Sequence, residues 1–204
     1  MATAEKKSLF VHGENGGQVV TTGNPITDLD IILNYSYLNA TIHSTNGICY
    51  QDAADPLALA AGANTSGCPA GTATSATQNI VGATLPASPK DKVALNAIYT
   101  FHFNPGSLAF SGAYIWRDQT YDSVFNRSYN LAPSYSQVNL RAIWTDTSNR
   151  YSVIVYGDNV LNKVGEDASF GLAVTNPGAG QVIDPVVSYI PPRVYGVELR
   201  YRFH

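Results

Sequence analysis

The chain has 204 residues, a formal net charge of −3 and only 13% charged residues. This small negative charge argues against a nucleic-acid-binding surface, and no run of about 18 apolar residues is present that could form a transmembrane helix. The 13 tyrosines, 17 glycines and 11 prolines, with a single methionine, favour β structure over a helical protein. Residues 1–10 carry charges followed by very few apolar residues, and so do not form a signal peptide.

The first strong strand pattern covers residues 28–41. Before it, residues 8–22 contain two short β-prone runs interrupted by glycines, from which we predict one weak, irregular strand. Within residues 28–41, alternate positions are apolar over a length that suffices to cross a bilayer when the strand is tilted. The residues on this apolar face are Leu29, Ile31, Leu33, Tyr35 and Tyr37.

Residues 43–90 form a long segment of Ala, Gly, Thr, Ser, Asn and Pro without a sustained period, which predicts a loop. It contains both cysteines of the chain, Cys49 and Cys68. Two cysteines in one loop predict a disulfide, which requires an oxidising compartment. Its loop-closure contribution is roughly 3 kcal/mol. The alternative interpretation is two unrelated free thiols.

Four further strands are predicted at residues 91–103, 107–121, 135–145 and 150–162, and a last one at the end of the chain. The connections between them are tight turns at residues 104–106 and 146–149 and a medium loop at 121–134. A second long loop is predicted at residues 163–192 from its glycines and prolines. Within that loop, Gly165, Glu166 and Asp167 predict a solvated acidic tip.

The last strand alternates from Gly196 onward. Apolar residues occupy one face and charged residues the other, a pattern that suits a strand between lipid and a polar lumen. The apolar face holds Val197, Leu199, Tyr201 and Phe203, and the charged face holds Glu198, Arg200 and Arg202. Terminal strands of bacterial outer-membrane barrels look like this, so the sequence predicts a barrel-assembly signal made of Gly196, Leu199, Tyr201 and Phe203.

Short turns alternate with longer loops along the whole chain, as in outer-membrane barrels with short periplasmic turns and long extracellular loops. The predicted fold is therefore all-β: an antiparallel transmembrane β-barrel segment of about seven strands, built as an open, curved partial barrel. Four leucines are expected to face lipid, namely Leu33, Leu95, Leu140 and Leu199. The polar side chains expected to face the lumen are Asp30, Asn96, Asn139, Arg141, Glu198, Arg200 and Arg202.

Several runs resemble the C-terminal part of the barrel of TonB-dependent receptors, the outer-membrane transporters for siderophores and other scarce nutrients. They are residues 30–40 (DIILNYSYLNA), 85–89 (LPASP), 135–145 (YSQVNLRAIWT), 151–163 (YSVIVYGDNVLNK) and 191–203 (PPRVYGVELRYRF). Within them, the segment from Asn159 to Lys163 is similar to the family's Asn-Leu-x-Asp/Asn-Lys segment near the end of the penultimate strand. The resemblance implies a barrel of about 22 strands around a plug.

The resemblance implies that residues 1–204 are the C-terminal portion of such a barrel, with the plug domain and earlier strands absent. The expected location is the bacterial outer membrane, and the expected partners are its lipid, the barrel-assembly machinery and a substrate such as a ferric siderophore. TonB would be reached only through the missing N-terminal part. Two alternatives remain: a small complete barrel of about eight strands with a binding or adhesion role, and a soluble lectin-like β-sandwich.

The sequence offers no enzyme chemistry. It contains no nucleophile elbow, phosphate-binding loop or dinucleotide fingerprint, so no catalytic residue and no cofactor are predicted. The histidines at 12, 43, 102 and 204 have no paired spacing with Cys, Asp or Glu, so no metal site is predicted either. The substrate-binding residues cannot be assigned from the sequence.

Overall fold

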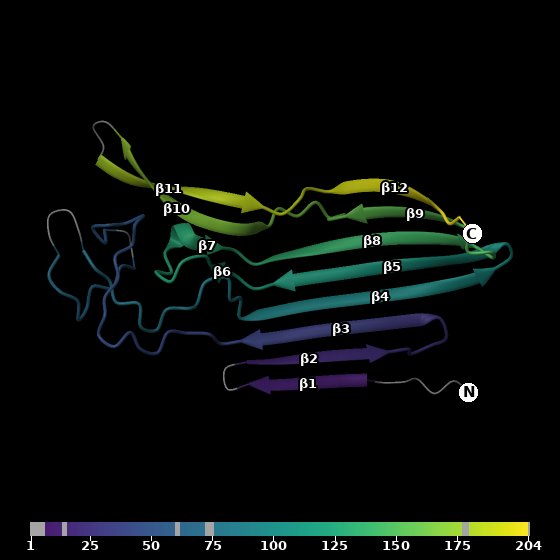
Figure 1. The fold of residues 1–204 in the computed structure, drawn as a ribbon, viewed down its shortest axis with the longest axis horizontal. Coiled ribbons are helices and arrows are strands. Elements are labelled where there is room, and N and C mark those ends of the chain that lie inside the picture. Colours follow the sequence, from purple (N-terminus) through teal and green to yellow (C-terminus); the bar gives the residue numbers. More distant parts are fainter. Residues whose placement is uncertain (1–6, 14–15, 60–61, 72–75, 177–179, 204) are drawn as a thin grey trace.

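The structure, a computed structural model, describes residues 7–13, 16–59, 62–71, 76–176 and 180–203. Twelve strands and one short 3₁₀ helix lie within these ranges, and no helix among them is long and apolar enough to cross a membrane. Eight strands form one antiparallel sheet in the order β1-β2-β3-β4-β5-β8-β9-β12 (Figure 1). Their bounds are β1 Lys7–Gly13, β2 Gly16–Gly23, β3 Leu29–Leu38, β4 Asp91–Phe103, β5 Gly106–Arg117, β8 Tyr135–Asp146, β9 Tyr151–Asp158 and β12 Val194–Tyr201.

The sheet is open, as predicted. Strand β1 pairs only with β2, and β12 pairs only with β9, so the two outermost strands are not joined in the described residues. From β2 onward, the tight turns lie at one end of the sheet and the long connections lie at the other, whereas β1 and β2 meet at the end of the long connections (Figure 1). This arrangement confirms the predicted alternation of short turns and long loops.

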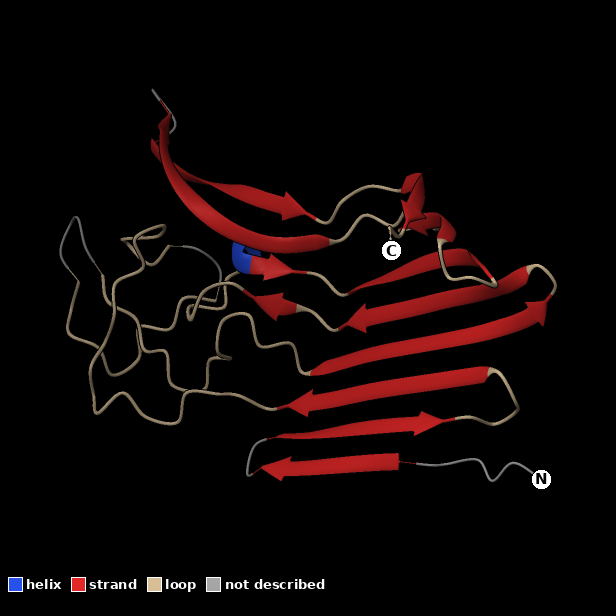
Figure 2. Ribbon diagram, turned by 45° about the vertical axis from the view of Figure 1, so that its right-hand side comes forward, coloured by secondary structure: helices blue, strands red, loops and turns tan. Residues whose placement is uncertain are grey.

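Two parts of the predicted organisation need correction. Residues 8–22 form two paired strands, β1 and β2, instead of one irregular strand, so the sheet has eight strands where about seven were expected. The segment 163–192 is not a plain loop, because it contains the paired strands β10 (Glu166–Asn176) and β11 (Gly180–Tyr189). The hairpin that they form extends beyond the loop end of the sheet (Figure 2).

The sheet has one apolar face and one mixed polar face, because alternate residues of a strand point to opposite sides. Register places Leu33 opposite Leu95, Leu95 opposite Tyr114, and Tyr114 opposite Val138 in one row. The next row toward the tight turns joins Ile31, Ala97, Gly112, Leu140, Gly157 and Tyr195. Side chains of this face are exposed, with Leu140 at 49% and Leu199 at 77%.

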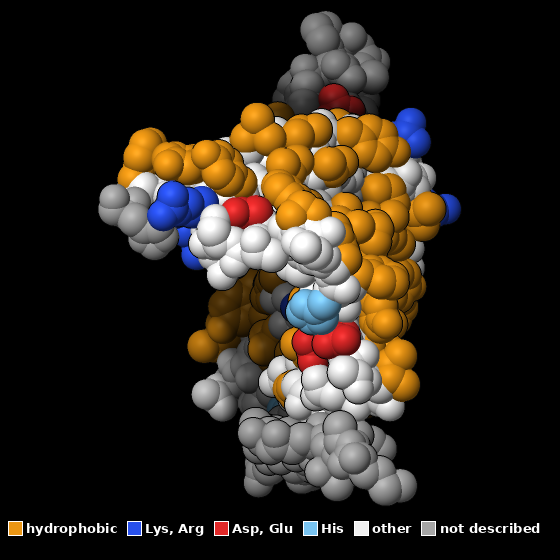
Figure 3. Space-filling view, turned by 90° about the vertical axis from the view of Figure 1, so that its right-hand side faces the viewer, with side chains coloured by type: hydrophobic (Ala, Val, Ile, Leu, Met, Phe, Trp, Pro, Cys, Tyr) orange, Lys and Arg blue, Asp and Glu red, His pale blue; other side chains and the backbone are white. Residues whose placement is uncertain are grey.

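The curvature of the sheet assigns these faces to an outside and an inside. Viewed along the strands, hydrophobic side chains cover the outer, convex side, and charged side chains lie in the hollow of the curve (Figure 3). Among the described residues, the only buried hydrophobic side chains are those of Ala132 and Ile154. A water-soluble protein of this size would instead bury a contiguous apolar core, so the apolar surface is on the outside of this fold.

A reciprocal pair of Tyr-Gly dipeptides joins the last two strands of the sheet. Tyr156 of β9 is paired with Gly196 of β12, and Gly157 of β9 is paired with Tyr195 of β12. A Cβ atom on Gly196 would overlap the Tyr156 ring, and one on Gly157 would lie 2.8 Å from Tyr195 Cδ1. Each tyrosine ring thus covers the glycine opposite, one on each face of the sheet, which gives Gly196 a packing role of its own.

Candidate functional site

The concave face carries a row of polar side chains at the loop end of the sheet. Register aligns Gln18, Ser36, Lys92, Arg117 and Tyr135 across the neighbouring strands β2, β3, β4, β5 and β8. The row lines a cavity of about 360 Å³ together with neighbouring residues of the same strands. Two adjacent cationic residues therefore lie on the wall of the hollow, close to where the long loops begin.

Arg117 is held in place within this row. Its guanidinium lies over the Tyr135 ring, 4.8 Å from the ring centroid, a cation–π arrangement. The same group donates hydrogen bonds to the carbonyl oxygens of Glu166 and, at 3.4 Å, Asp118. Lys92 is exposed. Arg117 therefore anchors the β10–β11 hairpin to the wall, whereas Lys92 offers its charge to solvent.

The polar residues expected on the lumen side do occupy the concave face. Asp30, Arg141 and Tyr156 belong to one row across the sheet, and Asn96 and Asn139 belong to the adjacent row, joined through Ala113. Their bonds are local: Asn139 Oδ1 accepts from Gln137 Nε2 and from the Asn159 backbone N–H, each at 2.9 Å. Glu198 and Arg200 form an exposed ion pair at 2.5 Å. These residues make a structural network and do not converge on one reactive point.

The terminal residues proposed as an assembly signal are split between the strand and its end. Leu199 and Tyr201 lie in β12 on the convex face, and Gly196 lies on the concave face under Tyr156. Phe203 follows the strand, is 87% exposed and packs edge-on against Tyr201, with ring centroids 4.6 Å apart. His204 lies outside the described residues.

Asn159 joins the two segments that flank the β10–β11 hairpin. Its side chain is 1% exposed, its φ is +50°, and its amide nitrogen donates to the carbonyl oxygens of Lys163 at 2.8 Å and Pro191 at 3.1 Å. Its Oδ1 accepts from the Lys163 backbone N–H at 3.0 Å. Asparagine suits this position because it tolerates the left-handed conformation and can both donate and accept.

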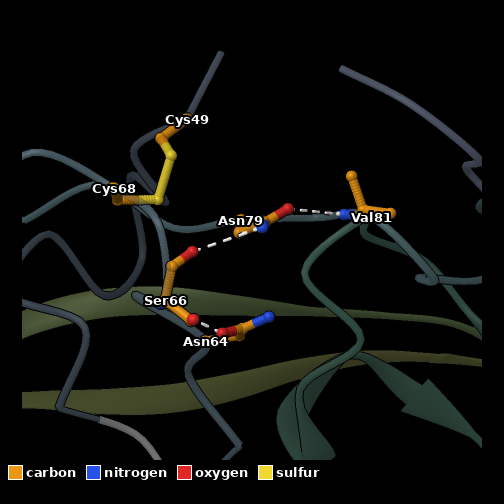
Figure 4. Close-up of a disulfide and its surroundings, with 6 residues drawn as sticks. All are labelled: Cys49, Asn64, Ser66, Cys68, Asn79 and Val81. Carbon is orange, nitrogen blue, oxygen red and sulfur yellow. Dashed lines mark hydrogen bonds between the residues drawn. A yellow bond between two sulfur atoms is a disulfide. The ribbon is translucent and has the colours of Figure 1, made fainter. Parts of the chain in front are cut away.

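The long connections fold together into what we call the loop assembly: the described residues of 39–90 together with residues 118–134, with the β10–β11 hairpin packed against them. The isolated bridges Thr41–Thr84 and Tyr50–Gln78 fold residues 39–90 back on themselves. The disulfide between Cys49 and Cys68, which the sequence predicts, is present in this assembly (Figure 4). In the same close-up, Asn79 donates to the Ser66 carbonyl and accepts from the Val81 N–H.

Hydrogen bonds of polar side chains connect the separate parts of the loop assembly. The Tyr129 hydroxyl donates to Asp52 Oδ2 at 2.8 Å, and the Ser169 hydroxyl donates to the Tyr129 carbonyl at 2.9 Å. Burial, together with this hydrogen bond to Asp52, raises the pKa of the Tyr129 hydroxyl above its ordinary value. Three segments far apart in the sequence are thus fixed around one tyrosine.

The sequence did not reveal this polar interior. Gln78 and Arg127 are among the largest fully buried side chains of the described residues, and Asp52 and Asp55 are buried as well. Aperiodic polar loops carry no pattern that marks which side chains turn inward. The sequence interpretation of Gly165, Glu166 and Asp167 as an acidic tip is also wrong, because Gly165 is buried and Glu166 begins β10, paired with Tyr189.

No group of His, Cys, Asp and Glu residues that could hold a metal ion occurs in the described part of the chain. A hollow on the concave face and another in the loop assembly are lined by cationic, amide, hydroxyl and apolar groups of the described residues.

Comparisons with known proteins find similarity in structure alone. No family model and no curated protein sequence matches the chain. The fold is similar to the ferric yersiniabactin uptake receptor FyuA from Yersinia pestis, with a TM-score of 0.63 and 13% identity over 93% of this chain and 23% of the receptor. It is also similar to BauA, the ferric preacinetobactin receptor from Acinetobacter baumannii, with a TM-score of 0.57 and 15% identity over 97% of this chain and 26% of the receptor.

These matches concern the fold, because the identities are low. Both similar structures are receptors, and the chain spans about a quarter of the length of each. The resemblance to the barrel of TonB-dependent receptors, inferred from short sequence runs, is confirmed at the level of the fold: the chain has the structure of a segment of such a barrel.

Proposed function

We propose that residues 1–204 are the C-terminal portion of the barrel wall of a TonB-dependent receptor in the bacterial outer membrane. The observation that carries this proposal is the open, curved sheet with an apolar convex face, which matches 93–97% of this chain to about a quarter of each receptor. The plug domain and the other strands would come from a part of the receptor outside residues 1–204. The chain alone would not transport.

The proposed activity of the whole receptor is energised uptake of a ferric siderophore or another scarce nutrient. The convex face would contact lipid, and the loop assembly with Cys49 and Cys68 would face the cell exterior, where a disulfide persists. TonB would engage the N-terminal part of the receptor. The barrel-assembly machinery would recognise the terminal strand through Gly196, Leu199, Tyr201 and Phe203. The similar structures are receptors, which supports a binding and transport role instead of an enzymatic one.

Uptake by whole cells tests this function. Cells that carry the full-length protein should accumulate radiolabelled iron from at least one ferric siderophore, and the same cells without TonB should not. Accumulation that persists without TonB would contradict energised uptake. A protein that neither binds nor accumulates any of a broad siderophore panel would point to a different nutrient or to a different role.

A small complete barrel with a binding role remains the second candidate, because the sheet contains eight strands. Small closed barrels of about eight strands are known, and they join their first and last strands. In this chain β1 and β12 each have a single partner in the described sheet. The open arrangement therefore favours a wall segment of a larger barrel.

A further inference from the structure

A hollow of about 420 Å³ lies on the apolar convex face, over the neighbouring strands β5, β8, β9 and β12 (Figure 1). Its floor contains small residues in two adjacent rows of the sheet. Gly112 and Gly157 lie on either side of Leu140 in one row, and Ala142 is the small residue of the next row toward the tight turns. Larger apolar side chains surround them, namely Phe110, Val155, Val160 and Tyr195.

The two glycines contribute differently to the hollow. A Cβ atom on Gly157 would lie 2.8 Å from Tyr195 Cδ1 and from Val160 Cγ1, so these two side chains already cover that position. A Cβ atom on Gly112 would meet only Leu140 Cδ2, at 3.5 Å, which is an ordinary van der Waals distance. The backbone at Gly112 therefore has room for a side chain, and the glycine leaves this part of the surface unfilled.

A hollow on a surface that faces lipid is filled by hydrocarbon, because wall atoms without neighbours lose their dispersion attraction. Lipid tails are as apolar as leucine, so shape decides which apolar group fits best there. A flexible acyl chain can follow the irregular floor between Phe110, Leu140 and Val155. This step rests on the proposed position of the convex face in the outer membrane.

Tyr195 indicates the depth of the hollow in the membrane. It lies at the loop end of β12, whereas Tyr201 and Phe203 pack together at the other end, with ring centroids 4.6 Å apart. At about 3.3 Å per residue, the chain between these ends covers most of an apolar band about 25 Å tall, which aromatic residues bound at both interfaces. The hollow therefore lies directly inside the interface on the loop side.

A positive charge lies at the loop-side rim of this hollow. The Arg193 guanidinium is placed over the Tyr195 ring, 5.7 Å from its centroid, and no salt bridge joins it to a carboxylate of the described residues. Its backbone N–H donates to Asn162 Oδ1 at 3.3 Å, and the next residue, Lys163, is exposed like Arg193. Asp158 points to the opposite, concave face, because it alternates with Gly157.

We infer that the hollow and Arg193 together bind one membrane lipid with an anionic phosphate headgroup. One acyl chain lies in the hollow, and the phosphate accepts hydrogen bonds from the Arg193 guanidinium at the rim. Arginine suits this contact because its fork of donors matches the oxygens of a phosphate. The inference goes beyond uptake, because it assigns a binding site to the outer surface of the wall, whereas a transported substrate would pass on the concave side.

Photo-crosslinking tests the site on the full-length protein that contains residues 1–204, reconstituted in bilayers of dioleoylphosphatidylcholine. The probe is a phosphatidylglycerol with a diazirine near the carboxyl end of one acyl chain, and the comparison probe is the diacylglycerol with the same chains and no phosphate. Mass spectrometry of peptides locates the crosslinks, with the convex side of β3 and β4 as reference. Phosphatidylglycerol should label the hollow at least about fivefold more than diacylglycerol does, since one cation near the surface contributes about that factor.

Two variants separate the charge from the hollow. Arg193→Gln should remove most of the preference for phosphatidylglycerol. Gly112→Leu should fill the floor and reduce labelling there by both probes to the level of the β3 and β4 reference. Lys90→Gln is the matched control, because Lys90 also lies over a tyrosine ring, that of Tyr37, at 5.7 Å, and does not line the hollow. It should label as the unmodified protein does.

The free energy of unfolding in lipid, measured for each variant by urea titration, shows whether the variant folds. If Gly112→Leu is unstable, Ala142→Leu fills the hollow from the next row and provides the second test. Equal labelling along the whole convex face, unchanged labelling in a folded filling variant, or crosslinks between two protein copies at the hollow would overturn the site. These results would leave the membrane position intact, whereas absence of all crosslinks to the convex face would contradict both proposals.

Discussion

The division of the sheet into a lipid face and a lumen face can be tested at two adjacent residues of β4. Leu95 lies on the convex face, 38% exposed, between Leu33 of β3 and Tyr114 of β5. Asn96 points to the concave face and is paired with Ile32 and Ala113. Replacing each by arginine adds the same group to opposite sides of the same strand.

The expected costs differ because the two surroundings differ. Leu95→Arg places a guanidinium in the hydrocarbon layer, which costs about 2–4 kcal/mol near the bilayer midplane. Asn96→Arg places it in a polar hollow and removes a 3.5 Å hydrogen bond with the Ser111 hydroxyl. A weak bond of that kind is worth at most about 1 kcal/mol.

The measurement is reversible urea unfolding of the full-length protein in lipid bilayers, with intrinsic tryptophan fluorescence as the signal. We expect Leu95→Arg to lower the free energy of unfolding clearly more than Asn96→Arg does. Leu140→Arg should behave like Leu95→Arg. Leu33→Arg on β3 and Leu199→Arg on β12 test the same face on two other strands. Equal costs at Leu95 and Asn96 would refute the lipid and lumen assignment.

Three further predictions concern the loops. Asn159→Ala removes three side-chain hydrogen bonds of a fully buried residue at positive φ. It should therefore lower the free energy of unfolding by about 1–3 kcal/mol, measured by the same urea titration. No change would show that other contacts hold the junction at Lys163 and Pro191. Cys49→Ala should make residues 39–90 more sensitive to protease, because loss of the disulfide removes a loop-closure contribution of roughly 3 kcal/mol. Thiol labelling of intact cells should find neither sulfur of the unmodified protein free. Two labelled thiols would contradict the disulfide. The raised pKa of Tyr129 means that its neutral form stabilises the fold below the ordinary tyrosine pKa near 10, and that this contribution is lost as the pH rises further. Protease resistance of the loops should therefore fall at strongly alkaline pH, and Tyr129→Phe should reduce this dependence; an identical pH profile in the variant would contradict it.

The long strands of the large sheet could be predicted from the sequence because apolar residues occupy alternate positions along them. Lipid requires alternate apolar residues over a full crossing, so β4 was predicted with the bounds that the structure gives, residues 91–103. β3, β8 and β12 deviate from their predicted bounds only near their ends. The open sheet followed from the same reasoning, since too few strands are present to close at the curvature of a large barrel.

The errors occur where apolar residues do not alternate or where glycine and proline interrupt the alternation. Three glycines lie where β1 ends and β2 begins, namely Gly13, Gly16 and Gly17. Because they interrupt the β-prone runs, the sequence predicted one irregular strand instead of a hairpin. Strand β11 contains Pro185, which cannot donate to a ladder, and its hairpin extends beyond the sheet, so the segment was predicted as a loop.

The polar interior of the loop assembly had no sequence signal at all. Arg127 occurs within Asn-Arg-Ser, a motif that suggests only a glycosylation pattern, and Gln78 lies in an Ala-, Thr- and Ser-rich run. Their burial depends on contacts between residues 39–90 and 118–134, which no local pattern encodes. The cavity between these loops therefore becomes visible only in the folded chain.

We propose that residues 1–204 are a wall segment that requires further strands to complete a barrel. Unpaired backbone groups along β1 and β12 would each cost several kcal/mol in lipid, and the apolar convex face would promote aggregation in water. The direct measurement is to express residues 1–204 behind a signal peptide and to examine outer-membrane fractions for a heat-modifiable species on gels. We predict aggregated or degraded material and no heat-resistant monomer. Recovery of a stable, monomeric, heat-resistant barrel of this chain alone would contradict a wall segment and favour the small complete barrel.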